Sequence, residues 1–522
     1  MKSMMRTAVA PLLVALAAVS CSNASRETTS VDGGVPPKTP DASKTAPHPD
    51  ASTTKPHDAV APPREDDVGP CTSPMFQGSP LGVRCNALVD VEGRTVLLHG
   101  LNARVSGIFD DTFSDGRLPL MTLESFTAAD ASRIRALGFN ALRLPVNWSG
   151  IEPTDDGGIS ATYLDGVAAV TSACGAAGVL VLIDLHQDAY SKEIGQDGAP
   201  LWAISPPPTE LLGGPLTDLS TRFLSAQVQD AYATFFGGAD AGAFLRSRYA
   251  EMAAKLATRF ADDPAVMGFE LYNEPTASEA ELVSFDEEMI PAVRAAAPTK
   301  LILFEPNSIR DDINTAPLGS GSLGPGVVYA PHVYTLAFSD PDEPGVTEAT
   351  YAPSNLNALS EAQSWEAPLV ITEYGYPPGS PNFANWARWQ GDLEDQVRAS
   401  SFFWLWKEDG QGSWGFYDFN DAGVGTERPA VVAAMTRPRL EAAAGNLVSV
   451  AYDATASSLT VVFNGSEAVT APNVVSIGAG ASVPASGWTA TCDGKAVTTN
   501  GKDPLSVSCG GAGAHTLVVR TH

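Results

Sequence analysis

The sequence predicts an α/β protein, a (β/α)8 TIM barrel followed by a C-terminal all-β sandwich. Two patterns predict this fold. Between Cys71 and Leu440, eight short apolar runs alternate with helical stretches, and the chain then changes to alternating runs rich in Val, Thr and Ser. Most of the eight runs are continuously apolar, as expected of parallel strands covered by helices. Eight strand–helix units close into a barrel, whose functional residues lie at the C-terminal strand ends.

The barrel is expected to span residues 71–440, with several long connections between strand and helix. Its predicted strands are 96–102, 141–146, 179–186, 266–274, 301–306, 327–334, 369–375 and 401–406. Helical patterns cover 125–139, 161–177, 241–261, 279–297 and 384–399.

The first 20 residues form a predicted export signal. Lys2 and Arg6 precede an apolar run over residues 8–19, which is too short for an ordinary transmembrane helix. Cys21 follows Ala-Val-Ser, which resembles a bacterial lipoprotein cleavage box, although Ala stands where Leu is usual. We expect an exported protein, either a cell-envelope lipoprotein anchored through Cys21 or a secreted protein with an ordinary signal peptide.

Residues 21–70 are rich in Pro, Thr, Ser and Ala and have few large apolar side chains, so they predict a disordered tether. Because export permits disulfides, the close pairs Cys71/Cys85 and Cys492/Cys509 are each expected to form a local bridge. Cys174 lies in a helical pattern and is expected to be a small buried residue.

Residues 441–522 predict the sandwich, with alternating runs at 447–454, 458–465 and 515–522. Its aromatic residues are sparse: Tyr452, Phe463 and Trp488. We therefore expect this domain to pack against the barrel, with carbohydrate binding as the alternative.

Composition excludes some classes of function. The formal net charge of −28 and the pI near 4.5 argue against a nucleic-acid partner, which requires a basic surface. The six Cys show no zinc-like spacing and the His residues are dispersed, so no metal and no cofactor is expected. A monomer is expected.

Two glutamates end predicted strands on opposite sides of the barrel. Glu274 follows Asn273 at the end of the fourth strand, and Glu373 lies in a Thr-Glu-Tyr-Gly run at the end of the seventh. Either one alone could be a structural ion-pair partner. Together they match retaining glycoside hydrolysis, in which one carboxyl protonates the glycosidic oxygen and the other attacks the anomeric carbon. The two carboxyl groups are then expected about 5–5.5 Å apart.

Further motifs give a family resemblance. Arg143 lies in LRLPVNW, His186 in DLHQD, Asn273 before Glu274, and His332 and Tyr334 in a His-X-Tyr run. With a Trp on the eighth strand, these residues resemble glycoside hydrolase family 5 of clan A. Residues 184–203 and 401–415 resemble the endoglycoceramidases within it.

The resemblance implies a role for each matching residue. Glu274 would be the general acid/base and Glu373 the nucleophile. Asn273 would bind the sugar 2-hydroxyl, Tyr334 would donate to Glu373, and Arg143 would keep Glu373 ionised.

The remaining matching residues are expected at the sugar. His186, His332 and Asp188 would line its subsite, and Trp404 would stack on its ring, with Trp406 as the rival for that role. Lys407 and Glu408 are expected near outer hydroxyls.

The resemblance also implies the substrate, a glycosphingolipid, cleaved between its glycan and ceramide. Apolar residues in two loops agree with a lipid partner, unless the loops bury them: Ile108, Phe109, Phe113, Leu118, Leu120, Met121, Trp202, Ile204, Leu211 and Leu212. Membrane contact is expected only through this substrate or the lipid anchor.

Two other functions stay open. One is a family 5 β-glycosidase, endoglucanase or mannanase that acts on a polysaccharide or another β-glycoside. The other is an exported binding lipoprotein without catalysis. The sequence does not distinguish glucosyl- from galactosyl-linked glycans.

Overall fold

The computed structural model describes residues 75–521, apart from 239, 317–318, 410–413 and 479–486. The predicted signal peptide, Cys21, the tether and Cys71 lie outside the described residues. Residues 70–522 form one compact unit.

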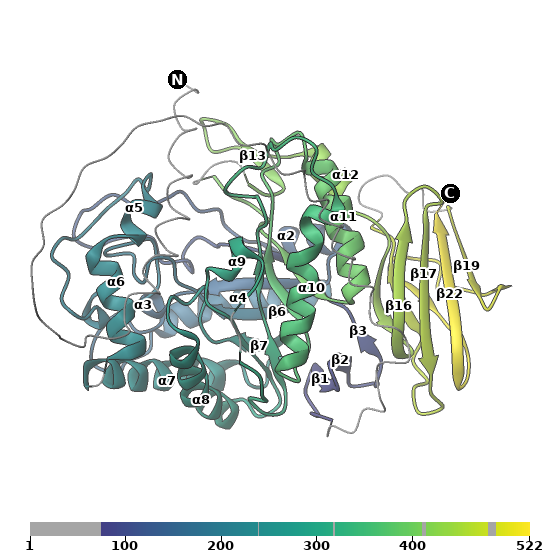
Figure 1. Cartoon of the computed structure of the whole chain (residues 1–522), viewed down its shortest axis with the longest axis horizontal. Coiled ribbons are helices and arrows are strands. Elements are labelled where there is room, and N and C mark those ends of the chain that lie inside the picture. The colour runs from purple at the N-terminus through teal and green to yellow at the C-terminus, as the bar shows by residue number, and fades with distance from the viewer. Residues whose placement is uncertain (1–74, 239, 317–318, 410–413, 479–486, 522) are drawn as a thin grey trace, which may run out of the picture. The chain divides into compact units, whose positions relative to one another are not determined.

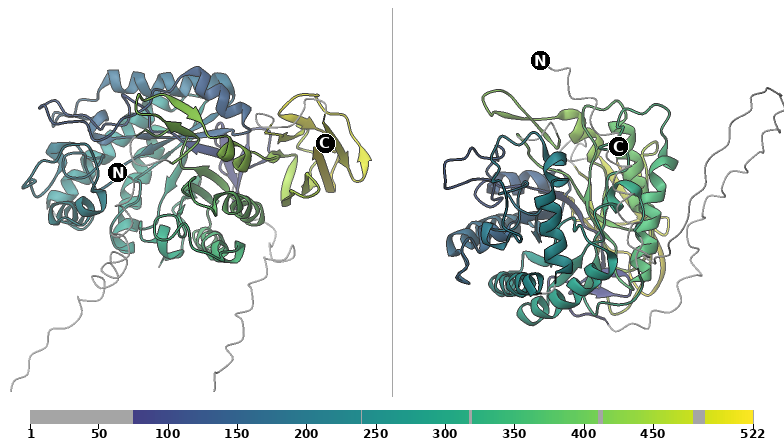
Figure 2. Two further views of the ribbon diagram at one scale, coloured as in Figure 1. Left: turned by 90° about the horizontal axis from the view of Figure 1, so that it is seen from above. Right: turned by 60° about the vertical axis from the view of Figure 1, so that its left-hand side comes forward.

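A ring of parallel strands forms the centre of the predicted barrel region (Figures 1 and 2). Its order is β10-β11-β12-β4-β5-β6-β7-β8-β9. The segments β9 and β10 share one strand position, interrupted at Ala330-Pro331. Strand β9 pairs with β8, and β10 pairs with β11, while a bridge joins Tyr329 to Leu369, so the ring closes. The predicted (β/α)8 barrel is confirmed, with a strand at each of the eight predicted positions.

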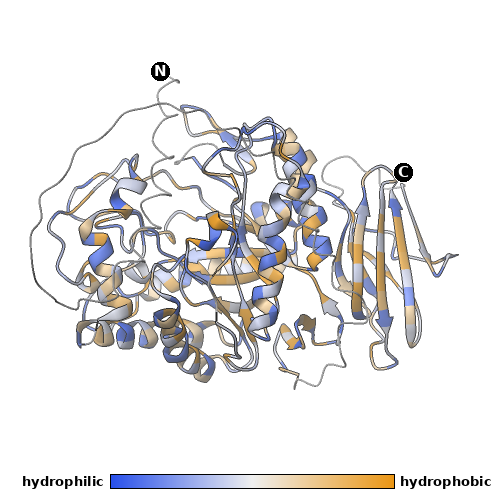
Figure 3. Ribbon diagram, viewed as in Figure 1, coloured by the Kyte–Doolittle hydropathy of each residue, from blue (hydrophilic) through white to orange (hydrophobic). Residues whose placement is uncertain are grey.

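The ring's strands are β4 (His99–Asn102), β5 (Ala141–Val146), β6 (Leu180–Leu185), β7 (Val266–Glu270), β8 (Leu301–Phe304), β9 (Val327–Tyr329), β10 (His332–Val333), β11 (Val370–Tyr374) and β12 (Ser400–Phe403). Strands β5, β7 and β11 are buried along their whole length, because ring and helices cover both faces. Figure 3 shows these central strands as mostly apolar.

The helices are α2 (Ala128–Ala136), α3 (Trp148–Ile151), α4 (Ala161–Ala177), α5 (Leu219–Phe223), α6 (Ala226–Tyr232), α7 (Asp240–Phe260), α8 (Glu279–Ala296), α9 (Arg310–Ile313), α10 (Glu348–Ser364), α11 (Phe383–Val397) and α12 (Pro429–Met435), with the short turns η2 (Leu201–Ala203) and η3 (Ala233–Gly237). Local sequence sets several boundaries. Thr127 caps α2 in a capping box with Asp130, and Gly178 ends α4 with a φ of 74°.

Helix α10 is absent from the sequence prediction. Its first half contains Pro353, which lacks a backbone N–H and is unfavourable inside a helix. The helix forms nevertheless, and it packs against α11 with buried residues such as Tyr351 and Ala358. Tertiary burial therefore outweighs local propensity here.

The C-terminal region is a two-sheet sandwich around its own apolar core (Figure 1). One sheet has the order β16-β17-β22-β19-β20 and the other β1-β2-β3-β15-β18-β21. The strands are β1 (Leu81–Arg84), β2 (Ala87–Asp90), β3 (Thr95–Val96), β15 (Arg439–Ala443), β16 (Gly445–Asp453), β17 (Ser458–Gly465), β18 (Asn473–Ser476), β19 (Trp488–Cys492), β20 (Lys495–Ala496), β21 (Leu505–Val507) and β22 (Gly513–Thr521); β13 (Tyr417–Phe419) and β14 (Gly425–Glu427) form a separate hairpin.

The sequence predicts a sandwich built from residues 441–522 alone, and the observed sheets include further strands. Strands β1–β3, from the start of the described chain, extend one of its sheets. Val96 ends β3, so the first barrel strand begins at His99 and not at residue 96. Leu97, between the two, packs into the sandwich core.

Buried polar contacts join the barrel to the sandwich. His99 lies between the Leu440 carbonyl oxygen, 3.0 Å from Nε2, and the Arg439 guanidinium, 3.0 Å from Nδ1. Burial and the nearby arginines lower the pKa of His99, so the ring is neutral and Nδ1 accepts from Arg439. Phe463 is fully buried, and Tyr452 and Trp488 pack partly buried against the sandwich core. These aromatic residues therefore contribute to the packing of the sandwich core.

The cysteines follow their predictions where the structure describes them. Cys492 and Cys509 form a disulfide, and Cys174 is free and buried. Cys85 is disulfide-bonded, and its predicted partner Cys71 lies outside the described residues. Within the described ranges, no helix combines the length and apolar character needed to cross a bilayer.

Strands β1–β3, which precede the barrel, pair in one sheet with β15, which follows it. We therefore expect the stability of the barrel to depend on the sandwich. A fragment of residues 75–440 lacks most of β15 and exposes Val96 and Leu97, each worth about 1.5–3 kcal/mol when buried. We expect it to unfold at a clearly lower temperature than a fragment of residues 75–522, in thermal unfolding followed by circular dichroism. Equal midpoints for the two fragments would contradict this dependence.

Candidate active site

The polar side chains of the barrel gather toward the C-terminal ends of its strands. Arg143 lies at the centre of this group and is fully buried. Its Nη1 donates to Asn102 (3.1 Å) and to Glu373 Oε1, its Nη2 donates to Asn273 Oδ1 (2.8 Å), and its Nε donates to Glu270. Register places Asn102 beside Arg143 on neighbouring strands.

Arg143 faces more negative charge than it can balance. Besides Glu270 and Glu373, Asp184 lies 3.0 Å and Glu305 lies 3.5 Å from Nη2. Burial by itself would lower the pKa of Arg143, but these four carboxylates raise it well above its usual range. The arginine is therefore a permanent cation.

Glu373 is held at both oxygens. Arg143 donates to Oε1, and the Tyr334 hydroxyl donates to Oε2 at 2.7 Å. The Glu373 side chain is only 4% exposed. One donor at each oxygen holds this carboxyl group in a fixed orientation.

Glu274 lies near Glu373, and one nitrogen of His332 is close to both. Nδ1 of His332 is 2.9 Å from Glu274 Oε1 and 3.8 Å from Glu373 Oε2. The two carboxylate oxygens are therefore at most 6.7 Å apart, the sum of those distances, a limit that includes the separation in retaining enzymes. The Glu274 side chain is 27% exposed, so it is the more accessible of the two.

The backbone around Glu274 is held in an unusual conformation. Its φ is 42°, in the left-handed region that non-glycine residues seldom adopt. Its N–H donates to Glu305 Oε2 at 3.0 Å. The Gln187 amide donates to the carbonyl oxygens of Asn273 (2.6 Å) and Glu274 (3.2 Å), and Asn273 Nδ2 donates back to the Gln187 carbonyl (3.0 Å). These bonds offset the strain and aim the Glu274 side chain.

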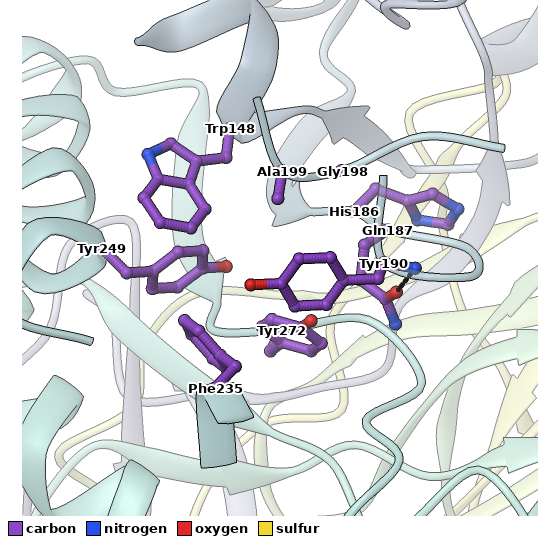
Figure 4. Close-up of a pocket in the computed structure, with 9 residues that line it drawn as sticks. All are labelled: Trp148, His186, Gln187, Tyr190, Gly198, Ala199, Phe235, Tyr249 and Tyr272. Atoms are coloured by element: carbon purple, nitrogen blue, oxygen red, sulfur yellow. Dashed lines mark hydrogen bonds between the residues drawn. The ribbon is translucent and has the colours of Figure 1, made fainter. Parts of the chain in front are cut away.

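Gln187 is itself fixed by a buried aromatic shell (Figure 4). Its Oε1 accepts from the Tyr190 N–H (2.8 Å) and the Tyr232 hydroxyl (2.5 Å). The small pocket in Figure 4 is lined by Trp148, His186, Gln187, Tyr190, Gly198, Ala199, Phe235, Tyr249 and Tyr272. It has space for about one water molecule, which is too little for a sugar ring.

His186 directly follows β6 and Trp404 directly follows β12, and their side chains lie against each other. Burial would lower the pKa of His186, but Asp184, 2.6 Å from Nδ1, raises it well above its usual value, so the ring is cationic. Asp188 lies 3.6 Å from Nε2. Trp404 is half-buried and stacks on His186, with centroids 5.9 Å apart and planes at 13°.

The structure separates the two tryptophans that follow β12. Trp406 is 1% exposed, and its Nε1 donates to Asp130 at 3.1 Å. Trp404 is thus the tryptophan that lies with the site residues, beside His186.

Two expected sugar contacts are engaged elsewhere. Nζ of Lys407 pairs with Asp130 at 2.6 Å, and Glu408 is buried in an ion pair with Arg104. Arg104 lies between the rings of Phe109 (5.4 Å) and Trp404 (5.3 Å). The expectation that Lys407 and Glu408 lie near outer sugar hydroxyls stays a prediction, and each already has an internal charge partner.

The two apolar loops are divided between burial and exposure. Ile108, Phe109, Leu120 and Ile204 are buried, so the expectation that they present an apolar surface is wrong. Leu118 and Leu211 are 63% and 42% exposed. Half-buried are Phe113, Met121, Trp202 and Leu212.

Sequence reasoning missed three buried carboxylates: Asp184, Glu270 and Glu305. Each lies in or just after an apolar strand run, and that position was the available signal. A carboxylate is rarely buried without a partner, so its presence there indicates an internal cation.

A metal ion would fit poorly among these buried acidic side chains. Glu270, Glu305 and His332 offer ligand atoms within 4.8 Å of one another. The Arg143 guanidinium already contacts Glu270 and would repel a metal ion there.

Comparisons with known proteins agree with this geometry. The family model described as Cellulase (glycosyl hydrolase family 5) matches residues 112–410. Endoglycoceramidase I of Rhodococcus hoagii (strain 103S) is 31% identical over 320 residues, which are 55% of this chain and 61% of that protein. A glucosylceramidase of Rhizopus delemar is 26% identical over 332 residues, 54% of this chain and 45% of that protein. The chain thus spans less than two thirds of these relatives.

A solved structure shares the fold. Endo-glycoceramidase II from Rhodococcus sp., as a ganglioside GM3 complex, aligns with a TM-score of 0.69 at 23% identity, over 84% of this chain and 99% of that one. The family model covers more than half of the chain, and its match includes both Glu274 and Glu373. The chain therefore belongs to glycosyl hydrolase family 5.

Proposed function

We propose that this protein is a retaining glycoside hydrolase that cleaves the β-glycosidic bond between a glycan and ceramide in glycosphingolipids. One observation carries the catalytic part of the proposal. Glu274 and Glu373 both lie close to Nδ1 of His332, at 2.9 and 3.8 Å, and they differ in environment. Two carboxyls with different environments can take the two different roles of the mechanism.

Glu373 is the proposed nucleophile. Arg143 and Tyr334 keep one oriented, ionised carboxylate in an almost fully buried position. Its attack on the anomeric carbon would form a glycosyl ester while the bond to the leaving oxygen breaks.

Glu274 is the proposed general acid/base. It would give its proton to the leaving ceramide oxygen and then take a proton from the water that attacks the ester. Its greater exposure suits exchange with leaving group and water. Ester formation neutralises Glu373, which removes a nearby negative charge before the second step.

The sugar subsite is proposed to lie between the two glutamates and Trp404. Asn273 Nδ2 uses one hydrogen for Gln187, and its second hydrogen is proposed to bind the sugar 2-hydroxyl. Trp404 would stack on the sugar face, and His186, His332 and Asp188 would bind hydroxyl groups.

An exposed leucine pair supports a lipid aglycone. Leu118 and Leu211 come from two different loops, which are joined because Gly214 N–H donates to the Leu118 carbonyl (2.9 Å) and Arg117 donates to the Leu212 carbonyl (2.7 Å). Arg117 also pairs with Glu193 at 2.5 Å, which ties these loops to the segment after His186. Exposed leucines of this kind suit an apolar partner. The names of both curated relatives above also denote ceramide glycosides.

The proposed location is the cell envelope. Export would follow from residues 1–20, and Cys21 would carry the lipid that anchors the tether of residues 21–70. Such an anchor would keep a monomeric enzyme near membranes that contain its substrate.

The substrate claim is tested with two classes of glycoside. We expect release of intact oligosaccharide and ceramide from a ganglioside, detected by mass spectrometry, and no release from soluble cellulose or mannan. L118S/L211S should lower kcat/KM for the ganglioside about tenfold, equivalent to roughly 1.4 kcal/mol of lost apolar contact, but leave a soluble aryl β-glycoside unaffected. V424S, at an exposed hairpin residue, is the matched control. Activity on polysaccharide alone would reject the proposal.

The catalytic roles are tested by separating the two steps. Glu373→Gln should abolish turnover of all substrates. Glu274→Ala should slow ceramide release by roughly 10²–10⁴-fold but spare the first step for an activated aryl glycoside, whose leaving group needs no protonation. Added azide needs no general base, so E274A should then form a glycosyl azide with retained configuration. Near-normal activity of E373Q would show that the roles are misassigned.

The anchor is tested in cells. Wild-type protein should fractionate with membranes and carry a lipid on Cys21 by mass spectrometry, whereas Cys21→Ser should not be lipidated. Identical fractionation of the two proteins, with no lipid on either, would leave only an ordinary signal peptide.

A further inference from the structure

Glu305 has no role in the mechanism above, although it contacts the proposed acid/base directly. It follows β8, is 6% exposed, and its Oε2 accepts the backbone N–H of Glu274 at 3.0 Å. The same Oε2 lies 3.5 Å from Nε2 of His332. His332 thus lies between Glu305 on one side and the Glu274 side chain on the other.

The His332 ring is neutral, so its two nitrogens differ. Burial lowers the pKa of His332 to about 4. Nδ1 faces Glu274 Oε1, while Nε2 has no hydrogen-bond partner within the usual limit among the described residues. Since one ring nitrogen carries hydrogen and the other accepts, the group that faces Nε2 decides which tautomer forms.

The four acidic side chains around Arg143 outnumber the buried cations beside them, Arg143 and His186. Asp184, Glu270, Glu305 and Glu373 surround this one arginine, and all four are buried. Such an excess of buried charge is relieved when a carboxyl takes up a proton. Burial, together with nearby Glu270, raises the pKa of Glu305 well above its usual range.

Glu305 is better placed than Glu270 to hold that proton. Arg143 donates a hydrogen bond to Glu270, which stabilises its ionised form, whereas Glu305 lies 3.5 Å from the nearest guanidinium nitrogen. A neutral carboxylic acid can donate a hydrogen bond in a site where a carboxylate can only accept.

We propose that Glu305 is a positioning residue that stays a carboxylic acid, donates to Nε2 of His332 and thereby fixes His332 as the Nδ1–H tautomer. Nδ1–H then donates to Oε1 of Glu274, so Oε2 of Glu274 is the oxygen that exchanges a proton with leaving group and water. The inference rests on the proposed role of Glu274. It adds a residue that determines which oxygen of Glu274 transfers the proton.

Charged and titratable groups face this pair from several elements. Glu305 and His332 are surrounded by Arg143 on β5, Asp184 on β6, Glu270 and Glu274 on and after β7, Asp311 on α9, and Glu373 on β11, with Tyr334 after β10. Of these, only Arg143 is a cation, and it binds Glu373 and Glu270 more closely than Glu305.

Glu305→Gln tests the proposal because it keeps the shape but reverses the hydrogen bond. The Glu274 N–H holds an acceptor at the Oε2 position, so the amide oxygen should lie there and accept from Nε2–H. His332 would then switch tautomer and present a lone pair to Glu274. The Glu274 carboxylate loses its donor, so its protonated form is favoured. For a soluble β-glycoside whose leaving group needs protonation, the alkaline limit of the kcat/KM pH profile should therefore move up by about one unit, a tenfold change in proton affinity.

Glu394→Gln is the matched control. Glu394 is equally buried, but its partners are Arg439 and Gln390, at 3.5 and 3.3 Å. Its profile should match the wild type. A Glu305→Gln profile that keeps its pH limits and only loses height would reduce Glu305 to a structural residue and overturn the proposal.

Nitrogen NMR of ¹⁵N-histidine-labelled wild-type protein reads the tautomer without activity. Between pH 5 and 8, the His332 signals, identified by their loss in His332→Asn, should be those of a neutral ring with hydrogen on Nδ1; in E305Q the hydrogen should move to Nε2. Hydrogen on Nε2 in the wild type, or an imidazolium, overturns the proposal even if E305Q fails to fold. If the wild type cleaves no glycoside at all, the proposed function fails instead, whatever the tautomer.

Discussion

The burial of Arg143 among four carboxylates is the constraint on which the site depends. A buried guanidinium is stable only where nearby anions offset its lost hydration. Glu270 and Glu373 do so through hydrogen bonds, and Asp184 through an ion pair at 3.0 Å. Arg143, Asp184 and Glu270 lie on the neighbouring strands β5, β6 and β7, and Glu305 follows β8, the next strand in the ring. Glu373 lies on β11, which β12 and β4 separate from β5. Closure of the barrel therefore brings Glu373 together with the cation that binds it. The fold of the barrel and the assembly of the site thus depend on the same contacts.

The two central glutamates differ in the groups that surround them. Glu373 lies among donors in the buried centre, whereas Glu274 follows β7 on a strained backbone that Gln187 and Glu305 hold by hydrogen bonds. His332 touches both, and its neutral ring adds no charge between them. Unlike environments for like side chains are what allow one carboxyl to attack and the other to transfer protons.

The barrel and its two central glutamates could be predicted from sequence because parallel strands give continuous apolar runs and function gathers at their ends. Helix α10 was missed because Pro353 opposes it locally and only packing on α11 reveals it. Arg104 and Glu408 lie far apart in sequence, so their pairing could not be foreseen. For the two apolar loops, composition predicted apolar side chains for contact with a lipid. It could not predict that Phe109 is buried while Leu118 is exposed.

The most direct test of the central claim is to trap the glycosyl ester. A 2-deoxy-2-fluoro β-glycoside with an activated leaving group should inactivate the enzyme, because fluorine slows both steps and the leaving group restores only the first. Mass spectrometry of the digested protein should then find one sugar on the peptide that contains Glu373, and none in E373Q. A label on another residue, or turnover of that glycoside without any ester, would contradict the account.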